Sequence, residues 1–295
     1  MLIAVIMALG SAACFATSSV LQYGAARLIP AAEALRPSLL LNLVHRPQWL
    51  LGLASSAAGF AMQGLALHFG SLVLVQPLVL TELLFALPIA AWFGHHAVGR
   101  HQWIPALAIA CGLGLFLSTA RPHGGRPNAP LSTWLLLAFA VTVAVGLSAS
   151  IASASGGSRL LRASVLAVGA GVTFGLLAAI LDSVSYLLAH RGLAGTLTTW
   201  QPYLLAAVAP TGEVFAQTAY QAGPITASLP VMYTLEPGTA IAIGVLAFDE
   251  RITHTAAAIG TEVAGIVGVL FGVVVLGRNS LRLPSEGIHR TGSPA

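Results

Sequence analysis

The sequence GSLVLVQPLVLTELL, at residues 70–84, places a glutamine, a proline and a glutamate inside an otherwise apolar run. A related sequence, GPITASLPVMYTLEPG, lies 153 positions later at residues 223–238. Three residues recur at this offset and one glutamate of each copy lies one position out of step: Gly70 and Gly223, Pro77 and Pro230, Thr81 and Thr234, and Glu82 beside Glu236. Two matched apolar segments, each interrupted by proline and bearing a carboxylate, are typical of the discontinuous helices of secondary transporters.

The similarity extends beyond these two segments. When residues 48–117 are laid on residues 201–270 without a gap, three further pairs coincide: Gln48 and Gln201, His101 and His254, and Gly112 and Gly265. Matches of alanine or leucine carry little weight in this composition, so these pairs are the better evidence for an internal repeat. With ten spans, the two copies begin five spans apart and face opposite sides of the membrane. We therefore expect two inverted-topology repeats.

The composition is that of an integral membrane protein. The chain has 295 residues, of which 57% are hydrophobic and 7% charged, and its mean hydropathy is +0.87, whereas a soluble domain carries about 25% charged residues. The net charge of +4 comes from thirteen arginines scattered between apolar runs. This distribution indicates membrane orientation and not nucleic-acid binding.

A membrane-crossing helix needs about 20 mostly apolar residues. Nine runs meet this criterion, near residues 2–22, 49–69, 71–93, 102–119, 131–152, 162–189, 200–221, 225–248 and 255–276. Charged residues interrupt the segment 25–48, although Pro37 to Val44 suits an interfacial or re-entrant helix. The fold class that we predict is an all-α integral membrane protein with 9–10 transmembrane helices in two inverted-topology repeats, the tenth helix being 25–48 if that segment spans.

The repeat divides the chain into four parts. The first transmembrane repeat occupies residues 1–120, with 25–48 as a poorly apolar connector or short second helix, and the second occupies residues 131–277. Residues 121–130, RPHGGRPNAP, are a polar linker between the repeats. Residues 278–295 are polar and are expected to form a disordered cytoplasmic tail.

The arginines also predict the orientation, because cytoplasmic loops are enriched in basic residues. If segment 25–48 does not span, nine arginines fall on one side of the membrane and four on the other. If it spans, Arg27 moves to the other side, and the difference in the number of arginines between the two sides becomes smaller. The loops at Arg100 and Arg159 and the C-terminus stay on the arginine-rich side in both cases. We expect a multi-pass protein of the cell (plasma or inner) membrane with a cytoplasmic C-terminus.

Acidic residues are unusually frequent inside the predicted spans. Five of the nine in the chain lie there: Glu82, Asp182, Glu213, Glu236 and Glu262. A central aspartate costs about 2.5–3.5 kcal/mol on an insertion scale, so such residues usually line a polar path or pair with other groups. The simpler alternative is a protonated carboxyl group that is hydrogen-bonded in a helix contact or lies near the membrane surface.

One predicted span carries a polar stripe. Glu213, Gln217, Tyr220 and Gln221 follow i, i+4, i+7, i+8 spacing and so share one helix face. The stripe suits a substrate pathway, and its alternative is helix-to-helix hydrogen bonding worth about 0.6 kcal/mol per contact. A weaker polar face on the first span comprises Ser11, Ser18 and Gln22. Together with the repeated segments, the candidate substrate-binding residues are Glu82, Gln76, Glu213, Gln217, Tyr220, Gln221, Tyr233, Glu236 and Asp182.

Three prolines lie inside the repeated segments, at Pro77, Pro230 and Pro237. Each removes a backbone donor and can kink or break a helix. Transmembrane prolines often do no more than kink a helix. The recurrence of Pro77 and Pro230 in equivalent positions favours a hinge or broken helix.

The run QWLLGLASSAAGFAMQGLALHFGSLVLVQPLVLTELLFALPIAAWF, followed by AIACGLGLFL, resembles the drug/metabolite transporter superfamily of EamA-like proteins. So does the later run GEVFAQTAYQAGPITASLPVMYTLEPGTAIAIGVLAFDERI, whose end at Asp249, Glu250 and Arg251 is similar to the helix-ending Glu-Arg of that superfamily. The sequence ALHFGSLVLVQPL is most similar to the branch that contains the NIPA magnesium transporters. At the corresponding place in the first half, Gly94, His95 and His96 replace the Glu-Arg.

This resemblance implies ten helices in two inverted five-helix repeats, a central cavity and transport without ATP. We accordingly predict a secondary transporter of a small solute, an organic metabolite, that works by alternating access. A transporter of Mg²⁺ or another divalent cation is the alternative, and a non-transporting membrane scaffold is the alternative of another class.

The remaining expectations concern chemistry and partners. No P-loop and no paired catalytic motif occurs in the sequence, so we expect neither an enzyme nor a cofactor, and metal ligands stay unassigned. The expected partners are a small-molecule or ion substrate and membrane lipids, with no nucleic acid, and a homodimer is left open.

Overall fold

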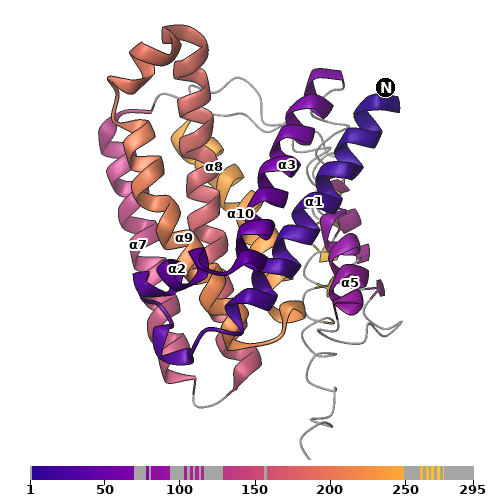
Figure 1. Ribbon diagram of the computed structural model, residues 1–295. Helices are drawn as coiled ribbons and strands as arrows, with labels where there is room; N and C mark the ends of the chain where they lie inside the picture. Colours follow the sequence, from indigo (N-terminus) through magenta and orange to yellow (C-terminus); the bar gives the residue numbers. More distant parts are fainter. Residues whose placement is uncertain are drawn as a thin grey trace, which may run out of the picture.

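The computed structural model describes residues 2–69, 78–79, 81–93, 129–155 and 158–248, with short pieces between 103 and 115 and between 260 and 275. Among these residues the chain is helical and contains no strand. Its elements are α1 (Leu2–Ala26), the 3₁₀ turn η1 (Ala31–Glu33), α2 (Pro37–Val44), α3 (Pro47–Phe69), α5 (Glu82–Trp92), α7 (Leu131–Ala154), α8 (Arg159–Leu197), α9 (Gln201–Ala222) and α10 (Ile225–Ala247) (Figure 1).

Three of these helices are long and apolar enough to cross a membrane: α1, α7 and the Arg159–Leu188 part of α8. The predicted class of an all-α protein with membrane-crossing helices is confirmed at this level. Helices α3, α9 and α10, with 23, 22 and 23 residues, have a similar length. At about 1.5 Å per residue each measures roughly 33–35 Å, which is comparable to the hydrocarbon thickness of a bilayer.

The helices form two groups. Helix α1 packs along α3 and against α5, and α8 packs against α7, α9 and α10. The groups meet chiefly where α1 and α2 contact α9, and Figure 1 shows them leaning apart toward the opposite end. The first group comes from the predicted first repeat and the second from the predicted second repeat.

Small residues allow the close packing of α1 on α3. The buried alanines of α1 recur every fourth residue, at Ala4, Ala8, Ala12 and Ala16. Side chains also bridge the two helices, because the Ser11 hydroxyl donates to a backbone carbonyl of α3 at 2.9 Å. Small faces of this kind let helix backbones approach each other inside a membrane, where the hydrophobic effect does not drive association.

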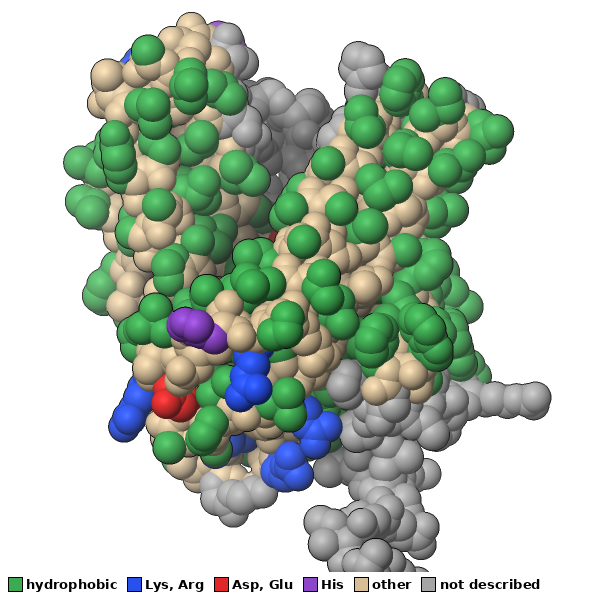
Figure 2. Space-filling view, viewed as in Figure 1, with side chains coloured by type: hydrophobic (Ala, Val, Ile, Leu, Met, Phe, Trp, Pro, Cys, Tyr) green, Lys and Arg blue, Asp and Glu red, His purple; other side chains and the backbone are tan. Residues whose placement is uncertain are grey.

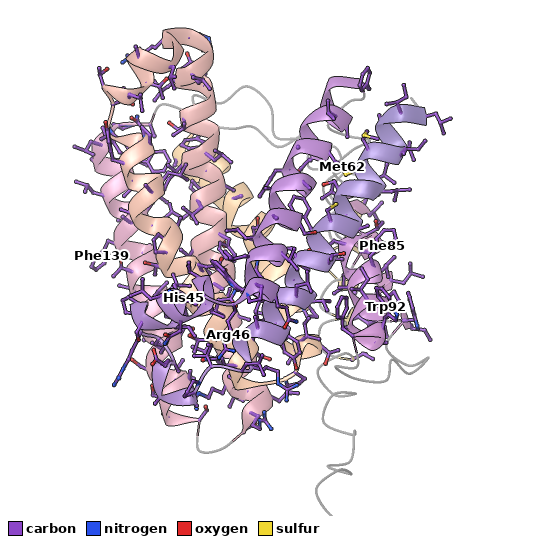
Figure 3. All side chains as sticks on the ribbon, in the orientation of Figure 1. His45, Arg46, Met62, Phe85, Trp92 and Phe139 are labelled. Atoms are coloured by element: carbon purple, nitrogen blue, oxygen red, sulfur yellow. The ribbon has the colours of Figure 1, made fainter. Side chains whose placement is uncertain are left out.

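The outer surface carries the large apolar side chains. Figure 2 shows hydrophobic side chains over the sides of both groups of helices. On α7, Leu136 and Phe139 are each 67% exposed, and Phe139 lies at the outer edge of the molecule in Figure 3. A surface of this kind is suited to lipid.

The predicted Pro37 to Val44 helix is present as α2, with eight residues. At about 1.5 Å per residue it measures roughly 12 Å, too short to cross a bilayer about 30 Å thick. It buries Leu39 and Leu43 and lies across the end of the molecule where the groups meet, between α3 and α9 (Figure 1). Segment 25–48 is thus a connector with a short helix, and the alternative of a tenth span there is not observed.

Glycines set how closely α8 and α10 approach. A Cβ atom at Gly171 would lie 2.8 Å from the Leu235 side chain, and one at Gly175 would lie 2.7 Å from the backbone oxygen of Glu236. The Gly171–Gly175 pair is therefore a close-packing surface, as its spacing predicts. Gly223 has an extended backbone and is needed for another reason, since its Cβ would meet the Arg159 carbonyl oxygen at 2.6 Å.

Helix α10 continues from Ile225 to Ala247 through Pro230 and Pro237. The predicted break at these two prolines is therefore not observed, and a hinge there stays a prediction. The Thr234 hydroxyl donates to the Pro230 carbonyl at 2.7 Å. The pronounced bend of the second group lies elsewhere, at Gly192 of α8, where φ is 66° and ψ is 178°.

Several predictions lie outside the described residues. These are the spans near 102–119 and 255–276 apart from short pieces, linker residues 121–128, the tail 278–295, and the individual residues Gln76, Pro77 and Glu262. The side chains of Asp182 and Pro237 also lie outside them.

Candidate functional site

Polar side chains from four helices meet in the interior, between the two groups. Helix α1 contributes two of them, α5 one, α9 three and α10 two. We call this set the central polar cluster, and it consists of Ser19, Gln22, Glu82, Glu213, Gln217, Tyr220, Tyr233 and Glu236. The stripe predicted on α9 and the carboxylates of both repeated segments thus converge in one place.

Glu82 joins the two groups of helices directly. It is in the first turn of α5, where the positive end of the helix dipole favours an anion. The Tyr233 hydroxyl of α10 donates a hydrogen bond to Glu82 Oε1. The Ser19 hydroxyl of α1 lies 3.4 Å from the same oxygen and 2.7 Å from the Tyr233 hydroxyl. One carboxylate therefore binds hydroxyl groups from helices on both sides.

Glu236 lies on the same helix as Tyr233, three residues further on, and so on the same side of α10. The Glu236 and Glu82 carboxyl groups interact electrostatically. The close approach of α8 at Gly175 faces the Glu236 backbone. The two out-of-step glutamates of the sequence repeat therefore lie near each other in space.

Gln217 is the centre of the α9 part of the cluster. Its side-chain nitrogen donates to Gln22 Oε1 at 2.6 Å and to Glu213 Oε1 at 2.7 Å. Gln22 in turn donates to the Ser18 hydroxyl at 3.0 Å. Gln217 is fully buried, and its side-chain oxygen has no hydrogen-bond partner in the part of the chain that the structure describes. A buried amide oxygen left unpaired is costly, which makes it a candidate contact for a bound molecule.

Tyr220 connects the two parts of the cluster. Its hydroxyl hydrogen-bonds with Ser19, and all three cluster glutamates interact with it electrostatically. Its ring packs edge-on against Tyr23, with ring centroids 6.0 Å apart. Arg27 donates to the Tyr23 hydroxyl at 3.3 Å and lies 5.5 Å from the centroid of that ring.

The cluster borders an opening in the molecule. Glu82, Glu213 and Glu236 lie deep within the protein, yet each keeps a partly exposed surface. Figure 2 shows a V-shaped opening between the two groups of helices, and an acidic side chain is visible at its depth. Among the described residues, part of the acidic interior is therefore visible from outside.

Not every predicted residue joins the cluster. Six do, namely Glu82, Glu213, Gln217, Tyr220, Tyr233 and Glu236. Gln221 instead donates to the Ile29 carbonyl at 3.3 Å and holds the α1–α2 connection against α9. Gln76, Pro77 and the side chain of Asp182 are outside the described part of the chain.

Two residues of this region were not predicted: Ser19, which belongs to the cluster, and Tyr23, which packs against it. Both lie on α1 near the predicted Ser18 and Gln22, and the four-residue spacing of Ser19 and Tyr23 could have indicated a shared face. A serine in a helix is too common to single out by itself. In the part of the chain that the structure describes, no group of three His, Cys, Asp or Glu side chains could hold a metal ion.

An uncharacterized protein of Corynebacterium glutamicum is 31% identical to this chain over 253 residues, which cover 85% of this chain and 86% of that protein. No family model matches the chain, and no solved structure matches it. The identity extends over most of both sequences, so it concerns the arrangement of the chain as a whole and not one local motif.

Proposed function

We propose that this chain, which belongs to the same family as the uncharacterized Corynebacterium glutamicum protein, is a secondary, ATP-independent transporter of a small organic solute. The observation that carries the proposal is the central polar cluster. Glu82 from the first group of helices and Tyr233 from the second form one hydrogen-bonded unit beside an opening. A membrane protein that places three carboxylates at such a junction has a use for them, because intramembrane charges are costly.

Alternating access is the mechanism that fits this geometry. If the two groups of helices rock about their contact at α1, α2 and α9, the opening between them closes at one end and appears at the other. The carboxylates of the cluster stay at the contact and meet the substrate from either side. In this proposal the two groups are the inverted repeats, and the chain is a member of the drug/metabolite transporter superfamily.

In this proposal the orientation in the membrane follows from the distribution of the arginines. Basic side chains gather at the end formed by the α1–α2–α3 connections and the start of α8 (Figure 2), where Arg46 and Arg159 lie. Arg191 lies some 32 residues along α8, roughly 48 Å away at about 1.5 Å per residue. By the positive-inside rule, the arginine-rich end faces the cytoplasm, and the C-terminus is on the same side.

The test is solute uptake by purified protein in liposomes under an imposed pH or ion gradient. The panel contains organic cations, neutral metabolites, organic anions and Mg²⁺, the last followed with a trapped magnesium indicator. The proposal predicts saturable uptake of at least one organic solute that is lost when the gradient is dissipated.

The other outcomes separate the alternatives. Uptake of Mg²⁺ alone would replace the organic-solute proposal by a divalent-cation transporter, for which Glu82 and Glu236 can supply the one or two carboxylates that hydrated Mg²⁺ uses. Folded protein that moves no member of the panel would favour a scaffold.

A further inference from the structure

The hydrogen-bonding capacity of the central polar cluster is unbalanced. Most of its donors already have partners: the Tyr233 hydroxyl donates to Glu82, the Ser19 hydroxyl to Tyr233 or Glu82, and the Gln217 amide to Gln22 and Glu213. The Gln22 amide donates to Ser18, beside the cluster. The unfilled positions are acceptors. The buried Gln217 side-chain oxygen has no partner among the described residues, and each carboxylate accepts up to about four hydrogen bonds.

The charge of the cluster is unbalanced in the same direction. Among the described residues, no arginine or histidine interacts electrostatically with Glu82, Glu213 or Glu236. Arg27 donates to the hydroxyl of Tyr23, whose ring packs against that of Tyr220, and does not itself bond to a cluster glutamate among the hydrogen bonds of the described residues. Three carboxylates therefore share an interior site without a counter-ion from the described part of the protein.

Aromatic rings border the same site. Tyr220 is 5% exposed and Tyr233 is partly buried. The Tyr220 hydroxyl hydrogen-bonds with Ser19, and the Tyr233 hydroxyl donates to Glu82. Ring faces attract cations, organic ammonium groups included, and the attraction increases when the cation leaves water. A bare metal ion is less well matched, because the three glutamates do not come together as a metal-binding group, and no other three His, Cys, Asp or Glu side chains among the described residues do so either.

From these observations we propose that the ligand of the central polar cluster is a small organic cation that donates N–H hydrogen bonds, a protonated primary amine. This rests on the proposed function, because it names the substrate class of the transporter site. The ammonium group lies against the glutamates and donates to the Gln217 side-chain oxygen, and the organic part lies along the tyrosine rings. One ligand then supplies the missing donor and the missing positive charge.

The experiment measures binding and does not depend on transport. The full-length protein, purified in detergent, is titrated with straight-chain primary ammonium chlorides from methyl to hexyl, and its thermal unfolding midpoint and heat of binding are recorded. Each amine has a matched control of the same length, the alcohol as a neutral isostere and the carboxylate as an anion. Tetramethylammonium and magnesium chloride are the controls without N–H donors.

We expect at least one amine of the series to raise the unfolding midpoint saturably and to bind about tenfold or more tightly than its alcohol, as charge-assisted hydrogen bonds provide. We also expect weaker binding of tetramethylammonium and no binding of the carboxylates. If no amine binds more tightly than its matched alcohol, or if a carboxylate or magnesium binds best, the proposal is overturned. This comparison uses only the natural protein, so it stands even if variants fail to fold.

Variants then locate the site. Glu213→Gln and Gln217→Leu should each weaken amine binding about tenfold or more. Glu33→Gln is the matched control, because Glu33 lies in η1, outside the cluster, and it should bind amines as the natural protein does. Equal binding by all three variants would place the amine elsewhere and overturn the assignment.

The result is separable from that of the uptake experiment. Amine binding at the cluster without any flux would keep this inference and remove the transporter. Uptake of neutral or anionic solutes only, with no amine binding, would keep the transporter and remove this inference.

Discussion

At the scale of single residues, the decisive contact is that of Glu82 with Tyr233. The two residues are 151 positions apart in the chain, and each belongs to a different group of helices. In the sequence, Glu236 has Tyr233 and Pro237 close by, whereas Glu82 has no such neighbour, which by itself favours the second copy as the place of the chemistry. The structure instead joins the copies, since Glu82 of the first copy accepts the hydrogen bond of Tyr233 in the second.

Replacing Tyr233 by phenylalanine tests this contact, because only the hydroxyl is lost. A side-chain hydrogen bond inside a bilayer contributes about 0.6 kcal/mol on average and up to about 1.7. We expect Tyr233→Phe to lower the free energy of unfolding by an amount within this range, measured by reversible unfolding in mixed micelles, while uptake falls by a larger factor.

The matched control is Tyr203→Phe. Tyr203 is 62% exposed, and its hydroxyl donates to the Leu197 carbonyl at 2.9 Å. This variant also loses one hydrogen bond but should keep full uptake. Equal uptake by the two variants would show that the Glu82–Tyr233 contact is merely structural.

At the scale of elements, the packing of α8 against α10 positions Glu236. The added methyl of Gly175→Ala would lie 2.7 Å from the Glu236 oxygen and 2.5 Å from Thr239 Cβ, so the helices must separate. Overpacking of this kind costs about 1–3 kcal/mol. We expect a lower thermal unfolding midpoint and reduced uptake, measured on the same reconstituted sample.

Gly146→Ala on α7 is the control for helix propensity, because a Cβ atom at Gly146 meets nothing within 4 Å. Alanine is favoured over glycine inside a helix by about 1 kcal/mol, so this variant should be neutral or slightly more stable. A drop in stability as large as that of Gly175→Ala would contradict the close-packing explanation.

A hydroxyl group of α9 also supports the α1–α2 connection, in addition to the Gln221 side chain. Leu35 has a positive φ of 58°, which is unfavourable for leucine, and its backbone N–H donates to Thr218 Oγ1 at 3.1 Å. Thr218→Val leaves that N–H without its partner, which costs about 1–3 kcal/mol if the group stays buried. We expect faster amide hydrogen exchange around residue 35.

Thr142→Val serves as the comparison for this variant. Thr142 is exposed, and its hydroxyl bonds only within its own helix, to Ala138. It should leave exchange at residue 35 unchanged. If Thr218→Val also leaves that exchange unchanged, the hydroxyl does not hold the connection.

Helix positions could largely be predicted from hydrophobic run lengths, whereas contacts between helices could not. The runs 131–152, 200–221 and 225–248 correspond to α7, α9 and α10, because polar or glycine residues end each run. The continuity of α10 through Pro230 was not predicted, since a lost backbone donor does not decide whether a helix breaks or merely bends. The Glu82–Tyr233 contact depends on how two groups of helices meet, and no local spacing encodes it.

At the scale of the whole molecule, the described residues form two groups of helices that meet at one end and lean apart toward the other (Figure 1). The predicted polar stripe of α9 faces the junction and not the lipid, as the burial of Gln217 and Tyr220 shows. The large exposed apolar side chains, Phe139 among them, face outward (Figure 3).

The proposed orientation predicts which ends of the molecule lie on each side of the membrane. In a variant whose cysteines, Cys14 and Cys111, are replaced by serine, a single cysteine at Arg46 should react with an impermeant maleimide only from the cytoplasmic side. A single cysteine at Arg191 should react only from the other side. Labelling of both from one side would contradict a bilayer that crosses α8 between its ends.

The most direct test of the transporter proposal is whether the cluster can be reached from both sides of the membrane. Ser19 is partly exposed and contacts Glu82 and Tyr233, so Ser19→Cys in the same cysteine-free background reports access to the cluster. Its modification rate by a small impermeant thiosulfonate is measured from each face of the membrane in turn, with the Arg46 and Arg191 variants as references for sidedness. Alternating access predicts modification from either face, slowed by a ligand that binds the cluster. Modification from one face only, or from neither, in protein that is folded would contradict it.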